Sequence, residues 1–209
     1  FRRVLFRSHL LSPIIRKFRI FHAERRLRSS KAVFLAGDSY PKDKAIEVAI
    51  RTRLAPLFGS WCGQTGIDKR RNGGRFIKDI PERVDGLRRE LESGRRRPGV
   101  LFGRSSGARV ATLLAAEQPV RAVICLGYPF QKPGEAPEPE RYEHLRSISV
   151  PTLILQGQAD PYGTFEQAKA FPVSRQVNLL PVDTNHEFRI EPEQWDRVAV
   201  EIRRFLQAL

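Results

Sequence analysis

Short, continuously apolar segments alternate with amphipathic segments along most of this chain. The apolar segments are AVFLAG at 32–37, PGVLFG at 98–103, VRAVICLGYPF at 120–130, VPTLILQG at 150–157 and QVNLLPV at 176–182. Apolar runs of this length are typical of strands buried on both faces, as in parallel sheets covered by helices. The sequence therefore predicts an α/β, doubly wound fold, with a mostly parallel sheet flanked by helices.

The intervening segments carry apolar residues at helical spacing. Helices are predicted over residues 41–59, 79–94, 106–118 and 191–209. A further helix is expected to begin near Thr164, because Gln167 three residues later completes a capping box.

Two segments depart from this pattern. Residues 60–78 predict one strand at 60–62 followed by a loop rich in glycine and arginine. Residues 9–31 alternate weakly at Phe18–Phe21, which favours one or two strands there.

The formal net charge of +14 raises the question of a nucleic-acid partner. Residues 1–31 contain ten basic residues and one acid, Glu24, so most of the excess charge lies there. We therefore divide the chain into a basic N-terminal arm, 1–31, and a domain over 32–209, and nucleic-acid binding is not favoured. Within the arm, Leu5–Ser8 matches the translation of a common sequencing-library adapter, so residues 1–8 are expected to be a remnant of it.

Cysteine content and hydropathy limit the class of protein. No apolar run approaches the roughly 20 residues of a membrane-spanning helix, so no membrane span is predicted. The two cysteines, Cys62 and Cys125, form neither a disulfide framework nor a zinc pattern. We expect a buried free thiol at Cys125, no metal, and a reducing, cytoplasmic location.

The strongest chemical signal is the stretch GVLFGRSSGARVA at residues 99–111. An apolar strand ends there in a turn and becomes a helix at once, with Ser105 between Gly103 and Gly107. A sharp turn of this kind projects a serine oxygen out of a sheet to where a base can reach it. It also directs the next amide, that of Ser106, toward a developing oxyanion. The stretch predicts a nucleophilic serine.

Two further reactive residues follow predicted strands. Asp160 comes after the strand at 150–157, and His186 after the strand at 176–182. Since the carboxyl ends of parallel strands meet at one edge of a sheet, these residues are expected to converge on Ser105. The order Ser, Asp, His is that of an α/β-hydrolase triad, in which His186 takes the serine proton and Asp160 orients His186.

The sequence also suggests residues around this triad. The second oxyanion amide is expected at Gly37 or Asp38, in the loop after the first strand. Substrate-pocket candidates are Arg104, Tyr40, Tyr128 and Tyr162. Arg104 is expected to be exposed beside the nucleophile, and Tyr128 either lines the pocket or packs in the core.

Residues 32–209 resemble the α/β-hydrolase superfamily, in its small dienelactone-hydrolase-like branch. The resemblance is carried by VLFGRSSGARVA, LGYPF, VPTLILQGQADPYG and DTNHEF. It implies hydrolysis through an acyl-enzyme at a Ser105–Asp160–His186 triad, with no metal or organic cofactor. Where relatives have His-Gly before the oxyanion loop, this chain has Ala36-Gly37. The dienelactone hydrolases themselves use a cysteine nucleophile, so Ser105 argues against their particular substrate.

The substrate class follows from a short connection. Residues 131–149 are polar and rich in proline, and they occupy the place where many relatives insert a lid. Because a helical cap does not fit there, an open site and a small or soluble ester substrate are predicted. The sequence indicates no oligomeric state.

Two alternatives stay open. Gly37-Asp38-Ser39 together with Asp183-x-x-His186 is similar to the blocks of SGNH esterases, with Ser39 as nucleophile, although no Gly-x-Asn-Asp block is present. The other alternative is a non-catalytic interaction protein on the same fold that binds nucleic acid or protein through the basic arm.

Overall fold

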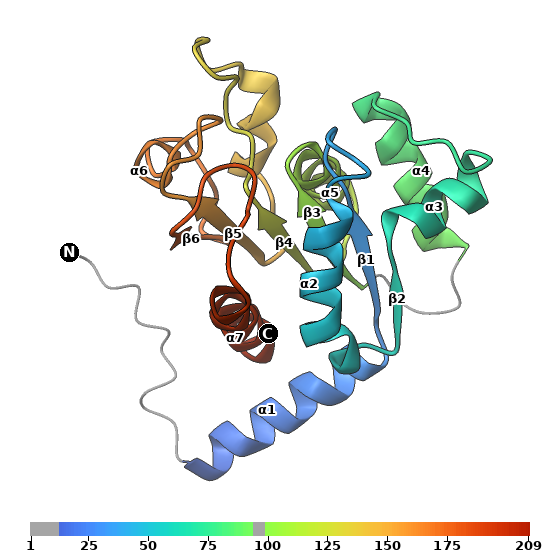
Figure 1. Ribbon diagram of the computed structural model, residues 1–209. Coiled ribbons are helices and arrows are strands. Elements are labelled where there is room, and N and C mark those ends of the chain that lie inside the picture. The colour runs from blue at the N-terminus through green and yellow to red at the C-terminus, as the bar shows by residue number, and fades with distance from the viewer. Residues whose placement is uncertain (1–12, 94–98) are drawn as a thin grey trace.

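Six parallel strands form the sheet at the centre of the molecule (Figure 1). They are β1 (Lys31–Leu35), β2 (Ser60–Cys62), β3 (Val100–Arg104), β4 (Ala122–Leu126), β5 (Thr152–Gly157) and β6 (Val177–Val182). Their order across the sheet is β2-β1-β3-β4-β5-β6, and each neighbouring pair is parallel. This computed structural model describes residues 13–93 and 99–209. The α/β, doubly wound fold predicted from the sequence is confirmed.

Helices occupy the predicted segments. They are α2 (Lys44–Leu54), α4 (Ile80–Glu92), α5 (Ser106–Glu117) and α7 (Pro192–Gln207). The one-turn helix α6 (Phe165–Ala168) follows Thr164, and its capping box with Gln167 is present as predicted. The 3-10 turns are η2 (Ala55–Leu57), η3 (Pro139–Arg141) and η4 (Glu143–Arg146). Gly94, where the second predicted helix was expected to end, lies outside the described residues.

The core has two layers because successive strand residues point to opposite faces of the sheet. On one face Phe34 and Phe102 pack against α2 and α7. On the other face Val33 and Leu101 pack against α4 and α5. Both faces of β3 are therefore covered by helices. Polar residues lie instead at the ends of the central strands.

The strands predicted within residues 9–31 are not found in the described residues 13–30, and residues 9–12 lie outside the described part of the chain. Pro13–Arg28 is a helix, α1. Ala23 and Leu27 are buried at a spacing of four residues, and α1 contacts α7 and η2. The strand prediction was wrong because it relied on the weak alternation at Phe18–Phe21 and not on the helical spacing of Ala23 and Leu27.

Residues 63–78 are not entirely loop. The strand predicted at 60–62 is present as β2, but Gln64–Arg71 forms a helix, α3. Its buried positions are Gln64, Ile67 and Asp68, two of which are polar. Because two of these three buried residues are polar, the sequence shows no hydrophobic periodicity in this segment, even though the buried positions have regular helical spacing.

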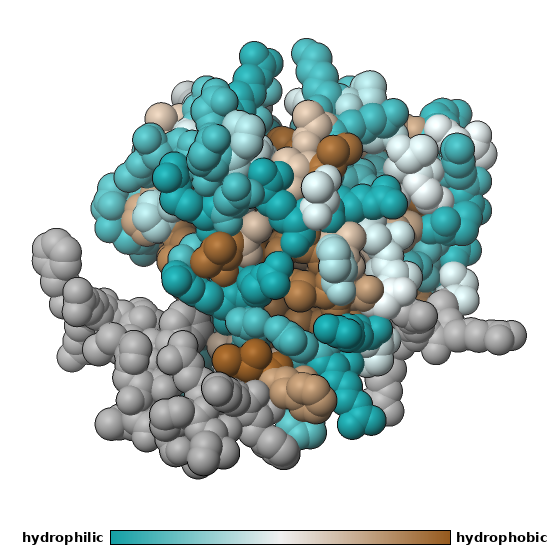
Figure 2. Space-filling model, turned by 60° about the horizontal axis from the view of Figure 1, so that its bottom comes forward, coloured by the Kyte–Doolittle hydropathy of each residue, from teal (hydrophilic) through white to brown (hydrophobic). Residues whose placement is uncertain are grey.

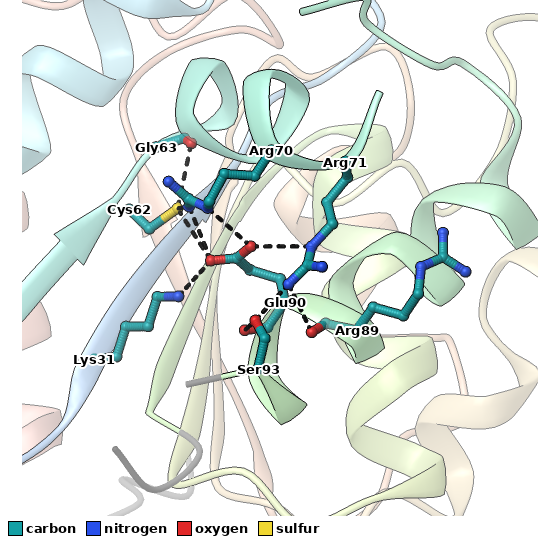
Figure 3. Close-up of polar contacts among 8 residues, drawn as sticks. All are labelled: Lys31, Cys62, Gly63, Arg70, Arg71, Arg89, Glu90 and Ser93. Atoms are coloured by element: carbon teal, nitrogen blue, oxygen red, sulfur yellow. Dashed lines mark hydrogen bonds and ion pairs between the residues drawn. The ribbon is translucent and has the colours of Figure 1, made fainter. Parts of the chain in front are cut away.

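One buried carboxylate joins several of these elements (Figure 3). Glu90 of α4 is 2% exposed and pairs with Lys31 of β1, with Arg70 of α3 at 2.8 Å and with Arg71 of α3 at 3.3 Å. The Sγ atom of Cys62 in β2 accepts a hydrogen bond from Arg70 at 2.7 Å. Three cations around one carboxylate thus fasten α3 and α4 to the edge of the sheet.

Figure 2 shows a face that is mainly hydrophilic, with hydrophobic side chains in separate patches. Within residues 13–93 and 99–209, no helix is both long and apolar enough to cross a membrane. Cys62 and Cys125 are free thiols, and the predicted burial of Cys125 is confirmed. Burial alone raises the pKa of the Cys125 thiol.

Candidate active site

Ser105 lies at the junction between β3 and α5. Its φ angle is +52°, a conformation that few residues other than glycine adopt. The flanking glycines are required by close contact: a Cβ at Gly103 would lie 2.4 Å from the Cα atom of Ala108, and one at Gly107 would lie 2.3 Å from the carbonyl oxygen of Leu35. The turn is thus as tight as the sequence predicted.

His186 and Asp160 reach Ser105 from two other strand ends. The Oγ atom of Ser105 is 2.9 Å from Nε2 of His186, and Nδ1 of His186 is 2.8 Å from Oδ2 of Asp160. His186 is 7% exposed and Asp160 is fully buried. The structure therefore brings the three predicted residues into one hydrogen-bonded chain.

Asp160 is held by neighbours close in sequence. The backbone N–H of Tyr162 donates to Oδ1 of Asp160 at 2.8 Å, and Nε2 of Gln156 donates to Oδ2 at 3.2 Å. The ring of Tyr162 covers the ring of His186, with their centroids 4.1 Å apart. Gln156 was not predicted to be a site residue. Its position at the end of an apolar run was a signal, because a buried side-chain amide needs polar partners, and Gln156 is fully buried.

Arg104 is not the exposed residue that was predicted. It is 1% exposed, donates to the backbone carbonyl of His186, and lies 3.2 Å from Nε2 of His186. Burial lowers the pKa of the Arg104 guanidinium, and the charges of Asp43 and Asp160 oppose that shift. The prediction was wrong because Arg104 still belongs to β3, a central strand, and the loop after β6 covers its side chain.

The loop after β1 lies against the nucleophile. A Cβ at Gly37 would lie 2.9 Å from the Cβ of Ser105. The Gly37 amide itself donates to Oδ2 of Asp43 at 2.6 Å, so this amide is not available to a ligand. The Asp38 amide has no acceptor among the described residues. Of the two predicted positions, only Asp38 is left as a candidate oxyanion donor.

The side chains of the two candidate donor residues bond to each other. The Oγ atom of Ser106 donates to Oδ1 of Asp38 at 2.7 Å, and Arg83 of α4 donates to the same Oγ at 3.0 Å. Burial lowers the pKa of the Arg83 guanidinium, and the charges of Asp38 and Asp68 oppose that shift. Ser106 belongs to the first turn of α5, where backbone N–H groups have no intrahelical acceptor.

Arg83 was not singled out in the sequence, although a signal was present. Arg83, Leu87 and Glu90 lie on one buried stripe of α4, at spacings of four and three residues. Charged residues on an otherwise apolar stripe are rarely buried without partners. The two charges therefore mark polar contacts beneath the helix.

The predicted tyrosines have different surroundings. Tyr40 is half-buried, stacks on Phe76 with centroids 5.0 Å apart, and shares a hydrogen bond with Thr65 at 2.7 Å. Tyr128 is fully buried, and its hydroxyl donates to the carbonyl of Arg141 at 2.5 Å. Of the two alternatives for Tyr128, the structure shows the second: its ring packs in the core, and its buried hydroxyl has a backbone partner.

Ser39 does not take the place of Ser105. It is exposed in the turn after β1, and no hydrogen bond joins it to His186 among the described residues. The arrangement required of an SGNH esterase is thus not formed by Ser39.

Two other features bear on what the site can hold. A surface groove of about 450 Å³ lies between α2 and α7, lined by residues such as Val48 and Trp195, but no triad residue borders it. In the part of the chain that the structure describes, no three His, Cys, Asp or Glu residues are grouped as metal ligands. The chemistry available at the strand ends is that of a hydroxyl, an imidazole, a carboxylate and backbone amides.

Residues 67–207 match the family model described as the alpha/beta hydrolase domain. The fold and this match define the class of protein as a hydrolase. Because the match spans more than half of the sequence, the chain belongs to the alpha/beta hydrolase family. A search of curated protein sequences finds no match.

Solved structures share the fold. An alpha/beta-superfamily hydrolase from Xanthomonas campestris is 20% identical, with a TM-score of 0.61 over 84% of this chain and 98% of that one. An esterase domain from Rhodothermus marinus is 16% identical, with a TM-score of 0.62 over 86% and 87%. A monoacylglycerol lipase from Paleococcus ferrophilus is 14% identical, with a TM-score of 0.64 over 86% and 95%.

Proposed function

We propose that this chain is a serine esterase in which Ser105 is the nucleophile, His186 is the general base and acid, and Asp160 orients His186. The observation that carries the proposal is the continuous chain of hydrogen bonds, 2.9 Å from Ser105 to His186 and 2.8 Å from His186 to Asp160. Family membership supports hydrolysis. An esterase domain and a monoacylglycerol lipase among the structural neighbours accord with an ester substrate.

The reaction begins at Ser105. Its Oγ attacks the ester carbonyl carbon while its proton passes to Nε2 of His186. The carbonyl oxygen becomes an oxyanion, which accepts hydrogen bonds from the amides of Ser106 and Asp38. Collapse of this intermediate breaks the bond to the alcohol, which leaves with the proton from His186, and an acyl group remains on Ser105.

Water completes the cycle. His186 removes a proton from a water molecule, whose oxygen attacks the acyl carbon. The second oxyanion collapses, Ser105 regains its proton from His186, and the carboxylic acid is released. Asp160 accepts a hydrogen bond from Nδ1 throughout, which keeps Nε2 directed at Ser105 and stabilises the imidazolium.

We propose small or soluble esters as the substrate class. The connection between β4 and β5 contains only η3 and η4 as regular structure, which supports the absence of a helical lid. Tyr162, over the His186 ring, and Tyr40, beside the oxyanion loop, are the residues proposed to contact the substrate.

The test is a panel of p-nitrophenyl esters from acetate to laurate. We expect the wild-type chain, residues 1–209, to hydrolyse acetate and butyrate faster than laurate. Ser105→Ala should abolish turnover, whereas Ser39→Ala should retain it. A fluorophosphonate probe should label Ser105 in the wild-type protein and not in the Ser105→Ala variant.

Other outcomes decide against the proposal. Turnover that survives in Ser105→Ala and disappears in Ser39→Ala would support the SGNH mechanism. Failure of both turnover and labelling, together with salt-sensitive DNA binding, would support a non-catalytic interaction protein.

A further inference from the structure

Arg83 contacts both segments that are proposed to supply the oxyanion hole. From α4, its guanidinium donates to Oγ of Ser106 at 3.0 Å and to the backbone carbonyl of Ala36. It also lies 3.6 Å from Oδ1 of Asp38. Ser106 begins α5, whereas Ala36 and Asp38 belong to the loop after β1, so one side chain bridges two separate parts of the chain.

These contacts close a ring of polar groups. Arg83 donates to Ser106, Ser106 donates to Asp38 at 2.7 Å, and Asp38 faces the Arg83 guanidinium. The two residues in this ring besides Arg83 are the ones whose amides are the candidate oxyanion donors. The position of the Arg83 guanidinium therefore affects how the amides of Ser106 and Asp38 lie relative to each other.

The surroundings of Arg83 hold that guanidinium in place. Arg83 is 7% exposed, and its guanidinium lies over the ring of Phe76, 5.0 Å from the centroid. On the other side of the loop, the amide of Ala36 donates to Oε1 of Gln64 at 3.0 Å. A buried cation is costly unless it is hydrogen-bonded, and here its bonds are made to the loop and to Ser106.

We propose that Arg83 is the positioning residue of the oxyanion hole, holding the amides of Ser106 and Asp38 in the geometry that the transition state needs. This inference rests on the proposed serine esterase mechanism. Oxyanion donors stabilise the transition state only if they are aligned before the reaction, because reorganising them would use up the gain. Among the described residues Arg83 has no hydrogen bond to Ser105, so it acts through Ser106 and the loop at Ala36–Asp38.

Arginine is suited to this task and lysine is not. The guanidinium is a planar fork that can donate to two acceptors in fixed directions, whereas an ammonium is a single point charge on a flexible stem. Arg83→Lys keeps the charge but should bridge Ser106 and Ala36 poorly. Arg83→Met removes both the charge and the donors while keeping an unbranched apolar stem.

The experiment separates transition-state binding from substrate binding. We expect Arg83→Met to lower kcat on p-nitrophenyl acetate by about 10- to 100-fold, less than or equal to the loss of one oxyanion donor. KM should change less than about threefold, and affinity for a trifluoromethyl ketone analogue should fall by the same factor as kcat/KM. Arg83→Lys should fall between wild type and Arg83→Met.

The matched control is Arg88→Met. Arg88 lies on the same helix but pairs with Asp85 and Glu117 at the surface, so its removal should leave kcat and analogue affinity unchanged. Should Arg83→Met fail to fold, the same measurement can be made on Arg83→Lys and Ser106→Ala. Ser106→Ala removes the hydroxyl that links Arg83 to Asp38.

The inference is overturned if folded variants at Arg83 and Ser106 keep wild-type kcat. It is also overturned if they lose kcat while the trifluoromethyl ketone binds as tightly as before. Failure of the serine mechanism itself has a different signature, namely turnover that persists in Ser105→Ala.

Discussion

The guanidinium of Arg104 donates to the backbone carbonyl of His186 and lies 3.2 Å from the Nε2 atom of the same residue. Arg104 immediately precedes Ser105 on the chain. The residue next to the proposed nucleophile thus also holds the loop that carries the proposed base, which couples the two strand ends directly.

Arg104→Met should therefore misplace His186 without removing it. Since shifts of about 1 Å in a catalytic group can cost 100-fold, we expect kcat on a small ester to fall by about 10- to 100-fold. Arg189→Met is the matched control, because Arg189 is exposed on the same loop. Equal kcat values in the two variants would show that the carbonyl contact has no role in placing His186.

Asp160→Asn should almost abolish turnover. An amide at this position would present a donor to Nδ1 of His186 and favour the wrong tautomer, and changes of this kind cost roughly 10⁴-fold in kcat in serine hydrolases. Asp183→Asn, at an exposed carboxylate following β6, should leave kcat near the wild-type value. Steady-state kinetics on p-nitrophenyl acetate make the comparison, and substantial turnover in Asp160→Asn would remove Asp160 from the mechanism.

Gly107→Ala should destabilise the protein and reduce its activity. The added Cβ would lie 2.3 Å from the carbonyl oxygen of Leu35 and 2.5 Å from that of Ala36, so β1 and the oxyanion loop must move. We expect a loss of about 1–3 kcal/mol in the free energy of unfolding, measured with urea. Gly86→Ala on α4 is the control: nothing lies within 4 Å of its Cβ, and a gain of about 0.5–1 kcal/mol is expected for a helix interior.

His144 should make stability depend on pH. Burial and the nearby charge of Arg109 lower the pKa of His144 to about 4, and its Nε2 atom lies 2.9 Å from Oγ1 of Thr112. In the unfolded chain the pKa is about 6.5. The unfolded state therefore binds more protons between these two values, so this contribution is complete above about pH 6.5 and is lost as the pH falls toward 4.

The variant His144→Gln tests this dependence. The free energy of unfolding of the wild-type protein should fall by up to about 3 kcal/mol more than that of the variant between pH 7 and pH 4. Urea titrations across that range provide the measurement. Parallel pH profiles for the two proteins would contradict the assignment.

Glu90 should also make stability depend on pH, in a lower pH range than His144 does. Burial by itself would raise the pKa of Glu90, but hydrogen bonds and charges from Arg70 and Lys31 outweigh it and hold that pKa below its usual value. The stability that Glu90 contributes is therefore present above the ordinary carboxyl pKa of about 4.3 and is lost as the pH falls through the lowered value.

Glu90→Gln should cost about 2–3 kcal/mol in the free energy of unfolding at neutral pH, because Lys31, Arg70 and Arg71 lose their shared partner (Figure 3). The difference from wild type should narrow below the ordinary carboxyl pKa. Glu117→Gln, which removes an exposed partner of Arg88, is the control and should have little effect. A constant difference at all pH values would mean that charge is not the cause.

The elements of the fold could be predicted wherever burial follows a simple period. The buried strands β3, β4 and β5 are mostly apolar runs, and α7 buries Trp195, Val198 and Ile202 at helical spacing. The helix α3 could not be predicted in this way, because Gln64 and Asp68 occupy its buried face and pair with each other at 2.8 Å. Polar pairs of this kind become visible only when both partners are placed.

The sequence by itself determined the parallel α/β layout and named Ser105, Asp160 and His186, because glycine spacing and strand-end position are local properties. Tertiary structure decided the environment of those residues. The burial of Arg104 depends on His186, 82 residues away, and the contacts of Arg83 depend on Ala36, 47 residues away. The Gly37 amide donates to Asp43, so of the two predicted loop amides it is that of Asp38 that has no acceptor among the described residues. Local pattern encodes which groups face the sheet edge, whereas hydrogen bonds between distant segments decide which of them remain available for chemistry.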